Sequence, residues 1–148
     1  MKSNAKKEFV TSLWCWTAGY PLVMVWGVDL MVSAALRRDM ALASEWLPKL
    51  FQSAIAAMPF VALAICGELL LGNDDKRSLS GLRFAAMSVA IASITLWVAY
   101  YWDAINAYTD QSIGGANIGL GLLLVFSPVL LSLLIPAAYL IGVSLFRS

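Results

Sequence analysis

One acidic residue lies within an apolar run, where it needs a partner. Asp29 stands in the segment 26–33, WGVDLMVS. A carboxylate at the centre of a membrane helix costs about 2.5–3.5 kcal/mol, so this one must face protein or water. It is either a protonatable or cation-binding group in a transport path, or a structural residue. In the structural role its partner would be Ser33, one helical turn away, or Arg37, whose long side chain can extend back toward the carboxylate. We favour the structural role.

A second polar stretch follows the third apolar block and runs from Trp102 to Asn117. It predicts an outer loop. Together with Asp29 and Ser33, polar residues of two outer connectors form a cap that is the best candidate surface for a partner or small ligand. These residues are Arg37, Arg38, Asp103, Asn106, Asp110 and Asn117. For residues 102–117 alone we favour the alternative, a solvated hairpin between two helices without a binding role.

The composition excludes several classes of site. The chain has no histidine, so His-ligated zinc or haem and Ser-His or Cys-His nucleophilic pairs cannot be built from it. The two cysteines, Cys15 and Cys66, are too few for a structural zinc site, and we expect both to be free thiols. We expect no metal, no cofactor and no enzymatic activity. A net charge of +1 without a long basic run offers no surface to nucleic acid.

The glycines between positions 114 and 121 do not form a phosphate-binding loop, because the Lys-Ser/Thr pair of such a loop is missing. Small residues four apart instead let two helices approach closely in lipid. That spacing occurs three times, in Gly115 with Gly119, Ser53 with Ala57, and Ser88 with Ala92. It predicts tightly packed helices.

The apolar residues of the chain fall into four blocks. Soluble domains average roughly 45–50% apolar and about 25% charged residues, whereas this chain of 148 residues is 61% hydrophobic and 13% charged. A helix needs about 20 residues to cross a hydrocarbon core about 30 Å thick, and each block is long enough. The blocks run from about Phe9 to Leu36, Leu50 to Leu71, Phe84 to Trp102, and Ile118 to Phe146. The sequence predicts an all-α, polytopic membrane protein, with a single transmembrane domain over residues 1–148 built as a four-helix bundle with short loops.

Charge bias orients the predicted bundle, because basic residues in short loops stay on the cytoplasmic side. With the N-terminus inside, the inner side holds seven of the ten basic residues, and Arg37, Arg38 and Lys49 are outside. We expect both termini in the cytoplasm, at a bacterial inner (plasma) membrane. Asp29 and Glu68 then lie near opposite faces, which argues against a site that uses both carboxylates.

Two functions fit this pattern, besides contact with the lipid bilayer. The first is a non-enzymatic protein that binds another membrane protein, a second copy of itself or an inserting partner, of the accessory-subunit or toxin-immunity type. It rests on the small residues suited to helix association and on the lack of paired charges within the predicted spans. The alternative is a small oligomeric transporter or pore that uses Asp29 and a fourth helix bent by Pro128 and Pro136. A membrane enzyme that acts on lipid is the third and least favoured possibility.

Overall fold

The structure is a computed structural model that describes residues 2–35, 42–70, 76–109 and 118–145. Every regular element in these residues is a helix. The first long helix consists of three segments without a break: α1 (Lys2–Pro21), the π-helical η1 (Leu22–Gly27) and α2 (Val28–Ala35). It is followed by α3 (Leu42–Leu69), α4 (Lys76–Thr109) and α5 (Ile118–Leu145). Four helices are long and apolar enough to cross a membrane, as predicted: Asn4–Ala34, Trp46–Leu69, Arg77–Ala107 and Ile118–Leu145.

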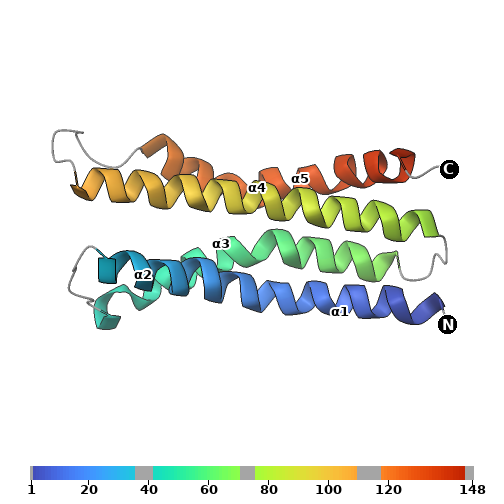
Figure 1. Cartoon of the computed structure of the whole chain (residues 1–148), viewed down its shortest axis with the longest axis horizontal. Coiled ribbons are helices and arrows are strands. Elements are labelled where there is room, and N and C mark those ends of the chain that lie inside the picture. The colour runs from blue at the N-terminus through green and yellow to red at the C-terminus, as the bar shows by residue number, and fades with distance from the viewer. Residues whose placement is uncertain (1, 36–41, 71–75, 110–117, 146–148) are drawn as a thin grey trace.

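The helices form an elongated bundle of two layers (Figure 1). One layer contains the first long helix and α3, and the other contains α4 and α5. The most extensive interfaces are those of α4 with α5 and of α1 with α3, and α3 also packs against α5. Both chain termini lie at one end of the bundle. We call this the terminal end, and the opposite end, where α2 ends and α3 begins, the distal end.

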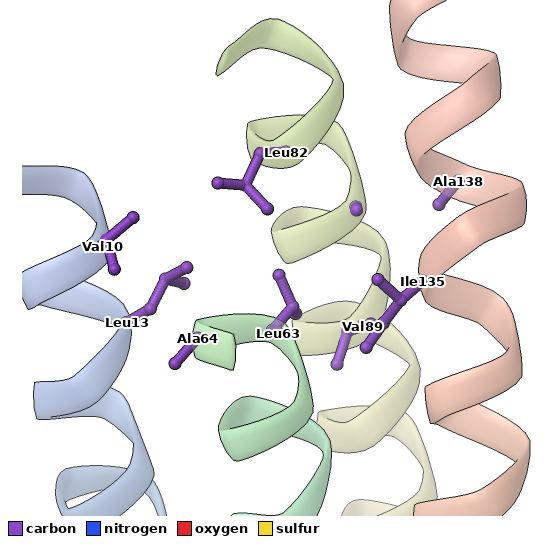
Figure 2. Close-up of a cluster of buried hydrophobic side chains, with 9 residues drawn as sticks. Val10, Leu13, Leu63, Ala64, Leu82, Val89, Ile135 and Ala138 are labelled. Atoms are coloured by element: carbon purple, nitrogen blue, oxygen red, sulfur yellow. The ribbon is translucent and has the colours of Figure 1, made fainter. Parts of the chain in front are cut away.

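A cluster of buried aliphatic side chains joins all four long helices in the terminal half (Figure 2). Leu63 of α3 and Val89 of α4 are fully buried at its centre. The other members are Val10, Leu13, Ala64, Leu82, Ala85, Ile135 and Ala138. In an apolar solvent such a cluster holds helices together by van der Waals packing, because lipid tails are as apolar as leucine.

Two glycines bring α4 and α5 into backbone contact. A Cβ atom built on Gly142 would lie 2.9 Å from the Cα atom of Gly81 and 2.7 Å from the Cβ atom of Phe84. Gly81 and Ala85 on α4, and Ala138 and Gly142 on α5, are each four residues apart, which is the small-xxx-small spacing of closely packed membrane helices. This contact occurs at residues that the sequence analysis did not select.

The small-residue pairs selected from the sequence have other surroundings. Gly119 is exposed on α5, and Gly115 lies outside the described residues. Ser88 and Ala92 are half-buried on α4, where the Ser88 hydroxyl donates to the Phe84 carbonyl of its own helix at 2.9 Å. Ser53 and Ala57 are half-buried on α3, and Ser53 bonds to η1 as described below.

α4 is longer than the third apolar block at both ends. The block ends at Phe84 and Trp102, but the helix runs from Lys76 to Thr109. Hydropathy marks where apolar residues end, whereas a helix continues until a breaker, and this segment has no proline and a single glycine. Arg83 and Trp102 are 19 positions apart, or about 28 Å along the helix, close to the thickness of a hydrocarbon core. α4 therefore extends about 10 Å beyond this segment at each end.

Gly142→Val should lower the free energy of unfolding by about 1–3 kcal/mol, because the new side chain overpacks the α4–α5 contact. Gly121→Val is the matched control on the same helix, since a Cβ atom there meets nothing within 4 Å. Thermal unfolding of both variants in mild detergent measures the difference. Equal melting temperatures would show that the glycine contact does not stabilise the bundle.

Candidate functional site

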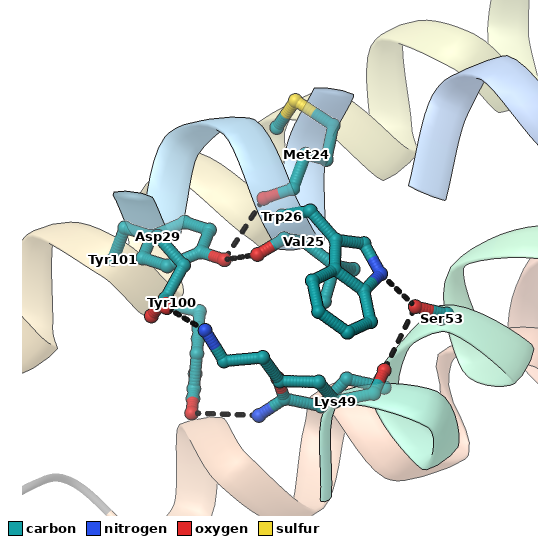
Figure 3. A network of polar contacts seen from close by, with 9 residues as sticks. Met24, Val25, Trp26, Asp29, Lys49, Ser53, Tyr100 and Tyr101 are labelled. Atoms are coloured by element: carbon teal, nitrogen blue, oxygen red, sulfur yellow. Dashed lines mark hydrogen bonds and ion pairs between the residues drawn. The ribbon is translucent and has the colours of Figure 1, made fainter. Parts of the chain in front are cut away.

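An ion pair joins the first long helix to α3 in the distal half (Figure 3). The Nζ atom of Lys49 on α3 donates to the carboxylate of Asp29 in the first turn of α2. The Lys49 side chain is 9% exposed and the Asp29 side chain 31%. Each residue lies six or seven positions from the distal end of its helix, or about 10 Å along the axis. The two charges therefore meet at the same depth, and Asp29 has the partner that its apolar surroundings require.

This pairing corrects two expectations. The sequence analysis found no paired charges within the predicted spans and placed Lys49 at the edge of a connector. In the structure α3 already begins at Leu42, and its apolar part starts at Trp46. Lys49 therefore lies inside the helix. The signal was present in segment 46–51, WLPKLF, where the lysine has apolar neighbours on both sides.

Lys49 is further held by an indole ring and a hydroxyl group. Its ammonium lies 5.6 Å from the centroid of the Trp26 ring, a cation–π geometry that strengthens where water is excluded. The Trp26 indole N–H donates to the Ser53 hydroxyl at 3.0 Å, and that hydroxyl donates to the Lys49 carbonyl at 2.8 Å. Asp29 and Trp26 thus contact the ammonium directly, and Ser53 holds the Trp26 indole against α3.

The π-helical segment η1 alters the backbone just before Asp29. The Val28 N–H donates to the carbonyl five residues earlier, instead of four as in an α-helix. Pro21, which has no N–H to donate, immediately precedes the segment. From α4, the Tyr101 hydroxyl lies 2.8 Å from the carbonyl oxygen of Met24 and 3.3 Å from that of Val25 (Figure 3). A side chain of the other layer thereby supplies a donor where the regular ladder is interrupted.

Buried aromatic rings pack beside this segment. Trp97 of α4 is 1% exposed, and its ring centroid lies 5.9 Å from that of Tyr101. Two residues before η1, the Tyr20 hydroxyl accepts a hydrogen bond of 2.8 Å from buried Ser93 of α4. Gln52 of α3 reaches the hydroxyl of the neighbouring Tyr100 at 3.5 Å, the long limit of a hydrogen bond. These contacts align three helices around the ion pair.

The predicted outer surface is only partly a loop. Asp103 and Asn106 lie on α4, half-buried in its last two turns, so their placement in a loop was wrong. The stretch after Trp102 is polar but contains no helix breaker before Gly114, so the helix continues past the apolar segment. Ser33 is half-buried on α2. Arg37, Arg38, Asp110 and Asn117 lie outside the described residues.

The second carboxylate within a span is remote from the first. Glu68 accepts a hydrogen bond of 3.3 Å from the Trp14 indole N–H near the terminal end. It lies 19 residues beyond Lys49 on α3, or about 28 Å along the helix, so Asp29 and Glu68 are far apart, as predicted. Within the described ranges, no group of three or more Cys, Asp or Glu residues is placed to hold a metal ion.

A buried cation and two thiols lie toward the terminal end. The buried Lys6 donates its ammonium to the Leu70 carbonyl, just past the end of α3, where helix carbonyls lack partners and a cation is favourable. Cys15 is exposed, Cys66 is half-buried, and both are free thiols, which confirms that prediction.

A scan against protein-family models and searches of curated proteins and of solved structures found no match to this chain. The chemistry of the distal half consists of one ion pair, a cation–π contact and hydrogen bonds that link the first long helix to α3 and α4.

Replacing one member of the ion pair should destabilise the bundle more than replacing both. Asp29→Asn or Lys49→Met alone leaves a charge without its counterion, and we expect each to cost about 2–4 kcal/mol, somewhat below a fully buried pair because Asp29 is partly exposed. The double variant should recover part of that loss. Unfolding in mild detergent measures the coupling, with the exposed Lys7→Met as control. If the effects of the two single changes simply add in the double variant, Asp29 and Lys49 are not energetically coupled.

Proposed function

We propose that this chain is a small, non-enzymatic integral membrane protein that works by binding another membrane protein through its distal end. Membrane insertion is supported by four helices of sufficient length and apolarity. It is also supported by the exposure of many large apolar side chains, among them Met31, Leu133 and Ile91, each more than 60% exposed. In water such a surface would drive aggregation, whereas in a bilayer it faces lipid.

The observation that carries the binding proposal is the rigid extension of α4 past its apolar segment. Trp102 is 68% exposed, and Asp103 and Asn106 follow on the same helix. Asn106 is four residues from Trp102 and three from Asp103, so the three side chains lie on one side of the helix. An exposed tryptophan beside hydrogen-bonding groups is a composition typical of binding surfaces. Because they stand on a helix, their spacing is set before a partner arrives.

The ion pair supports this role indirectly. Asp29 and Lys49 tie the first long helix to α3, and Tyr101 ties it to α4 one residue before Trp102. The base of the α4 extension is therefore anchored to the rest of the bundle. A preformed surface binds with less loss of conformational entropy than a mobile one.

We further propose that both termini lie in the cytoplasm at a bacterial plasma membrane, with the distal end outside. The support is the charge bias of the sequence, which puts seven of ten basic residues on the side of the N-terminus, together with the common position of both termini.

The double change Asp103→Ala and Asn106→Ala should reduce the yield of a co-purified partner by about tenfold, equivalent to about 1.4 kcal/mol of binding. The measurement is quantitative mass spectrometry of proteins that co-purify from native membranes in mild detergent. Glu8→Gln, which neutralises an exposed carboxylate at the terminal end, should leave the yield unchanged.

Two results would count against the proposal. One is that the native protein emerges without a partner, and the other is that the double variant retains it. Orientation is checked with Asp103→Cys in a chain without Cys15 and Cys66. A membrane-impermeant maleimide should label it in intact cells, and labelling only after lysis would reverse the orientation.

A small transporter or pore is the second candidate, and one observation favours it. The Asp29–Lys49 pair lies beside a π-helical segment, and such segments are frequent at functional sites. α5 runs through both Pro128, which is buried, and Pro136, which is exposed, without a break. If Asp29 takes part in transport, the native protein should give ion flux in reconstituted vesicles, and Asp29→Asn should abolish that flux. Unchanged flux in that variant, or none from the native protein, would exclude this function.

A further inference from the structure

A groove runs between the first long helix and α4, from the terminal half to the middle of the bundle. Two cavities of about 430 and 340 Å³ follow each other along this groove, and Trp16 lines both. α1 packs mainly against α3 and α4 mainly against α5, so the α1–α4 side is the loosely packed side of the bundle. The hydrogen bond between Tyr20 and Ser93 holds the two helices together near the inner part of the groove.

The groove is somewhat longer than one leaflet of a bilayer and shorter than a full span. On α4 its lining residues run from Arg83 to Ile94. These two residues are eleven positions apart, or about 17 Å along the helix, and half of a hydrocarbon core is about 15 Å. On the first long helix the lining runs from Phe9 to Met24, or about 22 Å. A transmembrane helix of a partner would need a contact surface along the whole span. A single acyl chain needs about one leaflet, and the groove is long enough for it but shorter than a full span.

The chemistry of the groove is apolar along its length and cationic at its mouth. Aromatic and aliphatic side chains line its walls, among them Phe9, Phe60 and Met87. Arg83 is exposed at the end nearest the termini, with its guanidinium 5.8 Å from the centroid of the Phe9 ring. Among the described residues, no carboxylate forms an ion pair with the Arg83 guanidinium.

Arg83 lies at the depth expected for the lipid headgroups. It lies about 28 Å along α4 from Trp102, so the two residues mark the two faces of a hydrocarbon core. A guanidinium binds phosphate through two parallel hydrogen bonds, and basic sites between membrane helices bind the head groups of anionic lipids.

We propose that the α1–α4 groove binds one anionic phospholipid from the leaflet at the terminal end. An acyl chain lies along the groove past Trp16, and the phosphate rests on the Arg83 guanidinium. The inference requires the proposed membrane location but is independent of the proposed partner surface, which lies at the distal end.

The test compares two lipids on the purified full chain in mild detergent. Phosphatidylglycerol should raise the melting temperature by roughly 4–8 °C more than phosphatidylcholine with the same acyl chains. Arg83→Gln should remove most of this difference. Lys7→Gln, which removes an exposed cation that lines a different hollow on α1, should retain it. Ala86→Leu, which fills the groove, should weaken stabilisation by both lipids.

The groove itself is tested with a photoactivatable phosphatidylglycerol in native membranes. The adducts should map to residues 9–24 and 83–94. Equal stabilisation by the two lipids, full retention of the difference in Arg83→Gln, or adducts elsewhere would overturn the proposal. So would cross-linking of a protein into the groove, which would identify a partner helix as its occupant. None of these results depends on Asp103 or Asn106, so a failure here is distinct from a failure of partner binding.

Discussion

The Asp29–Lys49 ion pair constrains the arrangement of the distal half more than any other contact described. Both charges lie on apolar helix faces about 10 Å from the helix ends, where neither is stable alone. Their pairing fixes how far the first long helix and α3 are displaced along each other, because a shift of one turn would separate the charges. Trp26 and Ser53 then add directional contacts that define which side of α3 faces η1.

The π-helical segment belongs to the same constraint. A backbone that departs from the α-helical ladder in apolar surroundings needs other donors for its carbonyls. Tyr101 supplies one from α4, and it packs against the buried Trp97. The irregular segment, the ion pair and the aromatic cluster therefore stabilise one another.

The two halves of the bundle are held together by different physics. In the distal half, charges and hydrogen bonds specify which residues meet. In the terminal half, shape contributes more, through the aliphatic cluster around Leu63 and the backbone contact of Gly81 with Gly142, beside the hydrogen bonds of Lys6 and Trp14. The α1–α4 side remains the loosely packed one, because α1 packs mainly against α3 and α4 mainly against α5.

The sequence by itself determined the number of long apolar helices, the free state of both cysteines and the separation of Asp29 from Glu68. These follow from hydropathy, composition and spacing along the chain, which are one-dimensional properties. Only the tertiary structure decided the partner of Asp29, the contact of Gly81 with Gly142 and the position of Asp103 on a helix. A run of apolar residues does not reveal where its helix begins or ends. Lys49 was therefore assigned to a connector, although it lies inside α3. Which helix faces which depends on complementary surfaces that are far apart in the chain, and the spacing of small residues recurs too often to select one pair.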